Sequence, residues 1–411
     1  MSDSVYLNSE HLRSQIASAA LALNQACPNI PGRRMRNQIS HIRAFDARGE
    51  AVYYVANALR QHNIPLWVAY NMGYRLVDLY SEELISTKSA FDENPQSRSV
   101  LEWRVALHKN TMKLFHTIAT GYYNFEKPVN WEKYSFSSYE HKNFKSTMED
   151  KKIILPSMSV IEPNLDHDYK DVALFAVFDG HGGTECADYC AAQFPGCITD
   201  IPLSSTSVDK VLPTAFESID KRLNYICFND DLKCGTTASV VIIVEKTVHY
   251  AWVGDSGIAV LRDKELQQLT IPHTVDNSDE IKRVVDAGSE IFEIMGSRRV
   301  DGLLNITRAF GHPYHKKSIC SIPDTGKFDV GDNDYLLFLA SDGIWDFTTK
   351  EDLLTSLVQF VKSNPPEEYA QVASFVGSEA RTKSTDNVIL LIVFLKPVAD
   401  VWEHILGFDS E

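Results

Sequence analysis

The chain has 411 residues, of which 44% are hydrophobic and 23% charged, and its formal net charge is −15. This length suits two domains, and the composition is that of a globular protein. The longest apolar run, Val388–Leu395, is far shorter than the roughly 18 residues that span a bilayer, and the first residues lack the features of a secretory signal. An acidic protein repels a polyanion. We therefore expect a cytoplasmic protein that acts on neither membranes nor nucleic acid.

The seven cysteines do not form a metal-binding pattern. Cys186, Cys190 and Cys197 lie near one another in the sequence, but no histidine pair or second CxxC completes a zinc site. We expect the cysteines to be small buried hydrophobic residues in a reducing compartment.

Residues 1–130 differ from the rest in charge and periodicity. They hold 14 basic and 11 acidic side chains, whereas the remainder holds 26 and 44. Apolar side chains recur there at three- and four-residue spacing, which predicts helices. The predicted helical stretches are 12–23, 51–60, 66–80 and 100–118. No cluster of catalytic residue types appears, so we expect a helical domain that regulates or binds a protein partner.

From about Trp131 the chain changes to short apolar, β-branched and aromatic runs typical of strands. The predicted strands are 172–178, 236–245, 248–253, 335–340 and 388–395. Helices are predicted at 184–194, 208–225, 277–287 and 350–363. For the third helix we expect Asn277 or Ser278 as N-cap with Glu280 behind it. Strands grouped with separate helices predict an α+β sandwich over residues 131–411.

Four of these strands have an aspartate at one end. Asp179, Asp255 and Asp342 each follow a strand, and Asp386 lies just before the last one. A single aspartate there is usually a turn former. Four together indicate convergence in one cleft, where the carboxylates would repel one another strongly. Oxygen-preferring cations such as Mg²⁺ or Mn²⁺ relieve that repulsion, so the pattern predicts a metal centre.

Several short motifs occur in a characteristic order over residues 132–396. They are MED at 148–150, DGHGG at 179–183, CGTTA at 234–238, GDS at 254–256, GLLNITRAFG at 302–311, SDGIWD at 341–346 and DN at 386–387. This set resembles the PP2C/PPM metal-dependent protein serine/threonine phosphatases. The resemblance implies a β-sandwich of two antiparallel sheets flanked by helices. The preceding helical domain resembles the layout of the subgroup of nematode sex-determination and calmodulin-dependent-kinase phosphatases.

The resemblance also implies a ligand set for two Mg²⁺ or Mn²⁺ ions and a weaker third. Asp179 would bridge two ions, Asp342 and Asp386 would complete one site, and the Gly180 carbonyl would serve the other. The remaining implied ligands are Glu149 and Asp150, through water, and Asp255 and Asp346 at the third site. Water bridging the two ions would attack phosphoserine or phosphothreonine of a phosphoprotein directly.

Two further residues receive catalytic roles from the resemblance. His181 would protonate the departing oxygen, a task suited to imidazole near neutral pH. Lys145 stands where the family usually has a phosphate-binding arginine, so the charge is kept while the bidentate fork is lost.

Two other positions also depart from the family pattern. Gly257 replaces a usual arginine, and His312 replaces a common aspartate. These departures and Lys145 leave open an alternative, a weak or inactive phosphatase-fold scaffold that binds phosphoproteins. A serine protease, suggested by GDSG at 254–257, lacks recognisable His and Asp partners.

The division of the chain predicts a division of labour. A fragment starting near Trp131 should fold and hydrolyse an aryl phosphate at close to the full-length rate, while binding of a large protein should require the helical part. The alternative is that the helical part braces the sandwich, in which case the fragment loses stability and activity.

Overall fold

The computed structural model describes residues 10–26, 39–85, 97–121, 127–128, 130–161, 169 and 171–409. By contacts between residues, the chain forms two compact units. The first unit comprises Met1–Trp131, Ser157–Lys170 and Ala192–Gly196, and the second comprises the remaining residues.

The first unit is helical, and all four helices predicted for it are present. They are α1 (Glu10–Ala26), α2 (Ala44–Arg60), α3 (Leu66–Leu79) and α5 (Val100–Thr120), with a short α4 (Ser81–Leu84), a 3₁₀ turn η1 (Met158–Val160) and a small ladder of β1 (His41–Arg43) and β2 (Ser97–Ser99). Helices α2 and α3 pack closely because Gly73 has no side chain; a Cβ there would lie 3.0 Å from the Val52 Cα. The Gln193 amide donates a buried 2.9 Å hydrogen bond to the Asp46 carbonyl within the same unit.

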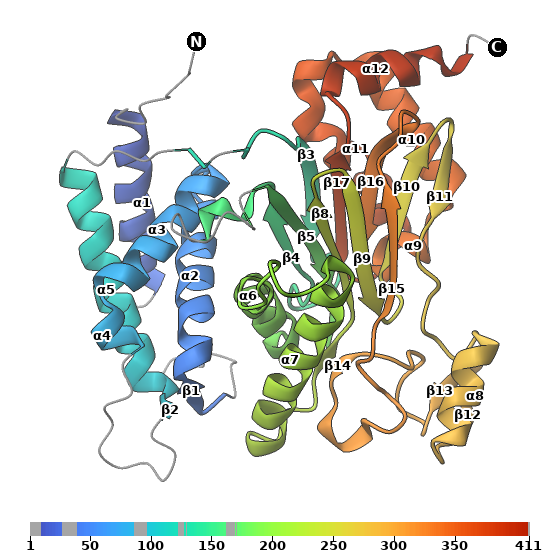
Figure 1. The fold of residues 1–411 in the computed structure, drawn as a ribbon, viewed down its shortest axis with the longest axis horizontal. Helices are drawn as coiled ribbons and strands as arrows, with labels where there is room; N and C mark the ends of the chain where they lie inside the picture. The colour runs from blue at the N-terminus through green and yellow to red at the C-terminus, as the bar shows by residue number, and fades with distance from the viewer. Residues whose placement is uncertain are drawn as a thin grey trace. The chain divides into compact units, whose positions relative to one another are not determined.

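The second unit contains two five-stranded sheets in which every neighbouring pair is antiparallel (Figure 1). In one sheet the order is β11 (Glu265–Gln268), β10 (Gly257–Arg262), β16 (Asp334–Ala340), β17 (Val388–Phe394) and β3 (Phe136–His141). In the other it is β15 (Asp324–Asp329), β9 (Thr247–Val253), β8 (Ala238–Val244), β5 (Val172–Phe178) and β4 (Lys151–Leu155). Every residue of β5 and β17 is buried, which explains their continuous apolar sequences.

Helices cover these sheets. Apolar side chains of α9 (Asp342–Trp345), α10 (Lys350–Ser363), α11 (Val372–Lys383) and α12 (Val398–Leu406) form one core with β10, β16 and β17. Helix α7 (Val208–Asn229) contacts β9 of the other sheet. The remaining helices are α8 (Ser278–Asp286) and α6 (Glu185–Thr199), of which Ala192–Gly196 belong to the first unit. Short 3₁₀ turns are η3 (Pro313–His315), η4 (Pro366–Gln371) and η5 (Gly407–Asp409). The predicted fold, two antiparallel sheets flanked by helices after a helical region, is confirmed.

Two smaller β elements complete the second unit. β12 (Ile291–Ile294) and β13 (Ser297–Val300) form a hairpin. A three-stranded ladder of two-residue strands has the order β14 (Phe310–Gly311), β7 (Gly235–Thr236) and β6 (Gly180–His181). This ladder brings together three motifs that lie far apart in the sequence.

The start of α8 confirms one prediction and corrects another. Asn277 is the N-cap, and its side chain accepts a hydrogen bond from the Asp279 amide. Glu280 does not complete a capping box; its carboxylate accepts hydrogen bonds from Arg283, Thr307 and Arg308 instead. Arginine partners are stronger donors than a backbone amide, so they take the carboxylate. We call these four residues the Glu280 network.

The cysteines behave largely as predicted. Five of the six in the described part of the chain are buried, Cys320 is half-buried, and all six are free thiols. Cys27 lies outside the described residues. Among the described helices, none is long and apolar enough to cross a membrane.

Candidate active site

The aspartates at the strand ends converge because of strand register. β5 ends at Phe178 and β9 ends at Val253, and the antiparallel β8 between them begins beside these two ends. Asp179 and Asp255, the next residues but for Gly254, therefore lie at the same end of the sheet's strands. In the other sheet, β16 ends at Ala340, and Asp342 is the first residue of α9.

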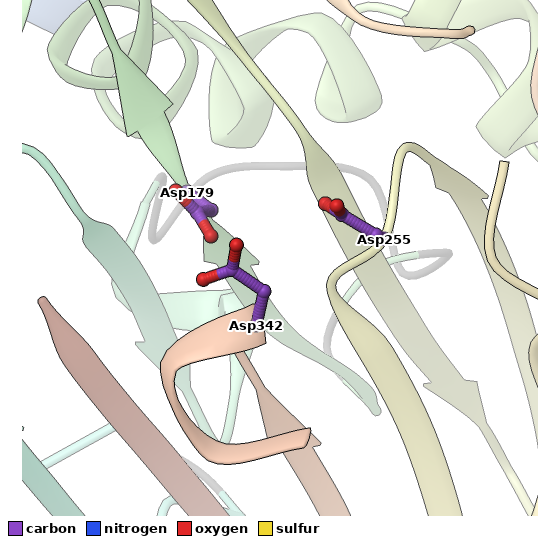
Figure 2. Close-up of side chains that lie close together, drawn as sticks. All are labelled: Asp179, Asp255 and Asp342. Carbon is purple, nitrogen blue, oxygen red and sulfur yellow. The ribbon is translucent and has the colours of Figure 1, made fainter. Parts of the chain in front are cut away.

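Asp179, Asp255 and Asp342 form a compact group that we call the acidic cluster. One carboxylate oxygen of each lies within 4.8 Å of the others, and the three side chains point toward a common centre (Figure 2). Three carboxylate oxygens at this spacing are the hard ligands that Mg²⁺ and Mn²⁺ prefer.

Electrostatics show that the cluster is unstable as three free carboxylates. Burial, followed by the neighbouring carboxylates, raises the pKa of Asp179 and Asp255 well above the ordinary value. Burial also raises the pKa of Asp342 to about 6, with further contributions from Asp346 and Asp386. A divalent cation supplies the charge that would restore these groups to the ionised form.

Asp150 lies beside this cluster and carries an unsatisfied atom. It directly precedes β4, whose Lys151 pairs with Phe178, so Asp150 and Asp179 follow at the same end of this strand pair. Asp150 is 3% exposed, and its Oδ2 has no hydrogen-bond partner within the described part of the chain. Burial raises the pKa of Asp150 to about 8. An orphaned buried carboxylate oxygen facing an acidic cluster fits a water or metal ligand.

The other residues implied as ligands lie around the cluster. Asp386 is not in the group of three; its Oδ1 lies 2.8 Å from Lys145 Nζ, and both side chains are about half exposed. Asp346 caps the C-terminus of α9 and contributes to the raised pKa of Asp255. Gly180 must be glycine, because a Cβ there would lie 2.5 Å from the Glu149 carbonyl oxygen.

Two residues to which we gave no role hold this site together. The Thr237 hydroxyl accepts a hydrogen bond from the Asp179 amide and lies 2.7 Å from the Ser256 hydroxyl, so it joins the loops that carry Asp179 and Asp255. The Asn387 side chain accepts from the Glu149 amide at 2.6 Å and donates to the carbonyls of Lys142 and Thr147. Thr237 belongs to the CGTTA motif and Asn387 to the DN motif, and this membership is the feature of the sequence that could have identified them as site residues.

His181 has an unexpected partner. Its Nε2 lies 2.6 Å from Nε2 of His312, and the two rings are nearly parallel, with an interplanar angle of 11° and centroids 4.9 Å apart. Burial lowers the pKa of His181 to about 4. Burial, together with the nearby His181, lowers the pKa of His312 to about 3.

Two other features of the sequence have local explanations. A Cβ at Gly257 would lie 2.6 Å from Gln268 Nε2 and 2.8 Å from Trp345 Nε1, so these side chains occupy the space an arginine would need.

Ser256 of the GDSG segment is 1% exposed and hydrogen-bonded to Thr237, which excludes it as the nucleophile of a serine protease.

Comparison with known proteins agrees with this geometry. Residues 134–389 match the protein phosphatase 2C family. The chain is 33% identical to protein phosphatase fem-2 of Caenorhabditis elegans over 66% of its own length and 61% of that protein. It is 28% identical to mouse protein phosphatase 1E over 85% of this chain and 47% of that one. The chain thus spans about half to three-fifths of the length of these relatives.

A solved structure resembles nearly the whole chain. A sex-determining protein of C. elegans superimposes with a TM-score of 0.79 and 25% identity, covering 95% of this chain and 96% of the other. The predicted family is therefore confirmed by a match that includes most of the second unit. The chain belongs to the protein phosphatase 2C family of metal-dependent protein phosphatases.

Proposed function

We propose that this protein is an active serine/threonine phosphatase that hydrolyses phosphoserine and phosphothreonine in proteins with two Mg²⁺ or Mn²⁺ ions and a weaker third. The observation that supports it best is the acidic cluster, in which partly buried carboxylates with raised pKa values face one another. The donor set fits these ions, because every implied ligand is a carboxylate or carbonyl oxygen. The ions, when bound, polarise the phosphoryl group and acidify water.

Each side chain then has a defined task. Asp179, Asp342, Asp386 and the Gly180 carbonyl hold the two ions. Glu149 and Asp150 orient water, while Asp255 and Asp346 hold the third ion. Lys145 contacts the phosphate after leaving Asp386, which its Nζ approaches to 2.8 Å. Lysine makes this contact as a point charge rather than a fork, so we expect a weaker hold on phosphate than arginine would give.

The proton for the departing oxygen comes from His181. The residue lies two positions after Asp179, at the end of β6, and this placement in the sequence supports the role. Water attacks phosphorus directly, and no side chain becomes phosphorylated. Ser256, the one hydroxyl in the GDS motif, is buried and already hydrogen-bonded, which agrees with direct transfer to water.

The setting and the role of the first unit are also proposals. The free cysteines, including Cys186 and Cys234, whose Sγ atoms lie at a hydrogen-bonding distance of 3.3 Å, support the proposal of a reducing cytoplasm. The helical unit carries none of the proposed catalytic residues. We assign to it, over residues 1–130, the binding of a protein partner or substrate, and to residues 131–411 the catalysis.

A phosphopeptide assay tests the proposal against the scaffold alternative. Protein stripped of metal with a chelator should not hydrolyse a phosphoserine peptide, and millimolar Mn²⁺ or Mg²⁺ should restore turnover. Phosphopeptide binding without turnover at any metal concentration would establish the scaffold instead. Turnover that survives verified metal removal would exclude the metal-dependent mechanism.

A further inference from the structure

The pairing of His181 with His312 results from the three-stranded ladder β14–β7–β6. In this ladder His181 lies directly opposite Gly235, and Gly311 lies opposite the same glycine from the other side. His312 is the next residue after Gly311, and its amide donates to the Cys234 carbonyl at 3.4 Å. Backbone pairing to the two sides of β7 therefore brings together two residues that are 131 positions apart in the sequence.

The ladder also provides space for the two rings. A Cβ at Gly235 would lie 2.6 Å from Nε2 of His181 and would collide with Nε2 of His312. Any residue other than glycine would therefore separate the imidazoles. The middle strand is thus shaped to accommodate this contact.

The backbone of His312 is held in an uncommon conformation. Its φ is +52°, in the left-handed region that residues with a Cβ adopt infrequently. Gly311 before it has φ of +80°. A residue that is kept in this region by its neighbours often has a functional reason to be there.

The ring geometry defines the contact. With Nε2 atoms 2.6 Å apart, ring planes within 11° and centroids 4.9 Å apart, the imidazoles meet edge to edge. Only one of the two Nε2 atoms can carry a proton at this distance, so one ring donates to the other. Such a bond fixes both the rotation of the ring and the nitrogen that bears the proton.

We propose that His312 is a positioning residue for His181: its Nε2–H donates to Nε2 of His181 and holds the His181 ring in one orientation. The proton that passes to the leaving oxygen is a second one, carried on Nδ1 of His181. This inference rests on the proposed function, because it assigns His181 the general-acid role. Without its partner, the His181 ring would turn freely about Cβ–Cγ and spend less time in the productive orientation.

Leaving groups distinguish positioning from general support of the fold. A serine oxygen needs a proton as it departs, whereas an aryl oxygen does not. His312→Ala should lower kcat for a phosphoserine peptide by about tenfold to a hundredfold, a part of the roughly 10²–10⁴ that general acid–base catalysis contributes. Mn²⁺-dependent hydrolysis of an aryl phosphate should change by less than about threefold, since the metal ligands are untouched.

Two conservative variants test the contact itself. In His312→Gln the amide nitrogen stands as many bonds from Cα as the imidazole Nε2, so it reaches His181 and should restore most of the peptide activity. In His312→Asn the amide stops one bond short, although asparagine tolerates the left-handed backbone well. This variant should behave as alanine does. His315→Asn, on the same 3₁₀ turn, is the control and should leave the ratio of peptide to aryl activity unchanged.

A double-mutant cycle completes the test. In the His181→Ala background, His312→Ala should cause no further loss of peptide turnover, because His312 acts only through His181. Additive losses, equal losses on both substrates, or equal behaviour of the Gln and Asn variants would overturn the positioning role. A wild-type protein that hydrolyses neither substrate with Mn²⁺ would refute the proposed function and this inference with it.

Discussion

The second unit contains two groups of carboxylates with opposite properties, one around the buried Glu280 and the other the partly buried acidic cluster. In the Glu280 network, Glu280 is 2% exposed, and burial alone would raise its pKa. Hydrogen bonds from Arg308, Thr307 and Arg283 outweigh burial and lower the pKa of Glu280 to about 2. In the acidic cluster, by contrast, the neighbours are other carboxylates, and the pKa values rise.

The difference shows which buried acids the chain satisfies itself. Glu280 has its counter-charges built in, so its carboxylate contributes to the stability of the fold. The cation whose charge acts on Asp342 is Lys145, which is about half exposed and already paired with Asp386, and it leaves the pKa of Asp342 raised. We therefore expect the cluster to take its remaining counter-charge from solution. This is the physical distinction between an acid that supports the fold and one that binds a cation.

The largest expected effect is on turnover when the acidic cluster is altered. Asp179→Asn should lower kcat for a phosphopeptide on the order of a hundredfold or more. Substitution of residues that only orient metal ligands typically lowers metal affinity or activity by about 10–100-fold, and a ligand itself should have at least that effect. The thermal midpoint of the chelated variant should not fall, since one repelling charge is removed. Asp332→Asn, a fully exposed aspartate, is the matched control. Near-normal turnover of the Asp179 variant would refute the site assignment.

Substitution in the Glu280 network should lower stability and leave the metal site intact, the reverse of the result expected for the acidic cluster. Glu280→Gln leaves Arg283 without its charged partner and Arg308 with Asp324 alone, and breaking a buried pair in this way costs about 3–5 kcal/mol. Urea unfolding at pH 7 measures this loss, with substitution of the exposed Glu265 on β11, Glu265→Gln, as the control. Metal affinity of the folded variant should remain that of the wild type. A variant as stable as the wild type would show that the network does not support the fold.

Removal of the first helices should have an intermediate effect. A fragment starting at Trp131 should still hydrolyse an aryl phosphate at close to the full rate, as the sequence predicts. It should melt lower, because Gln193 loses its buried partner Asp46, and an unsatisfied buried group costs about 1–3 kcal/mol. Gln193→Ala in the full chain should reproduce part of that decrease. An insoluble or inactive fragment would show that the helical unit braces the catalytic one.

The smallest expected effect is a pH dependence of the metal-free protein. Asp342 has its pKa raised to about 6, so the folded state holds a proton that the unfolded state has already released. The free energy of unfolding therefore falls as pH rises from about 4 through 6, where an unperturbed aspartate has a pKa of about 3.9.

Comparing the wild type with Asp342→Asn isolates this contribution. With chelator present, the variant should gain stability relative to the wild type between pH 5 and pH 7. Saturating Mn²⁺ should remove that advantage by stabilising the wild type. A stability difference that is independent of pH would contradict the raised pKa.

The sequence predicts the longest buried strands, but it misses the shorter β10 and β4, which are also mostly buried, and the exposed edge strand β15. β5 was predicted to the residue, and β9, β16 and β17 to within one residue at either end, because β-branched and aromatic runs persist where both faces are covered. β15 was missed: its sequence DTGKFD is polar, as expected for an exposed edge strand. Helix α6 continues through Pro195, where a proline normally ends a helix.

The sequence indicated which residues make up the site, but not which of their side chains contact one another. Strand ends indicated which aspartates converge, but not that Lys145 would pair with Asp386, which depends on the conformation of two exposed side chains. His312 stood out as a departure from the family pattern. Its contact with His181 was not predictable, because the two-residue strands β6, β7 and β14 leave no periodic signal.

Thermal unfolding of chelated protein titrated with Mn²⁺ tests the central claim most directly. If the acidic cluster takes its counter-charge from solution, the midpoint of the wild type should rise with Mn²⁺, since a ligand at 100 times its Kd stabilises by about 2.7 kcal/mol. The rise should be much smaller in Asp179→Asn and unchanged in the control Asp332→Asn. A wild-type midpoint that is insensitive to Mn²⁺, or an equal rise in the Asp179 variant, would contradict the account.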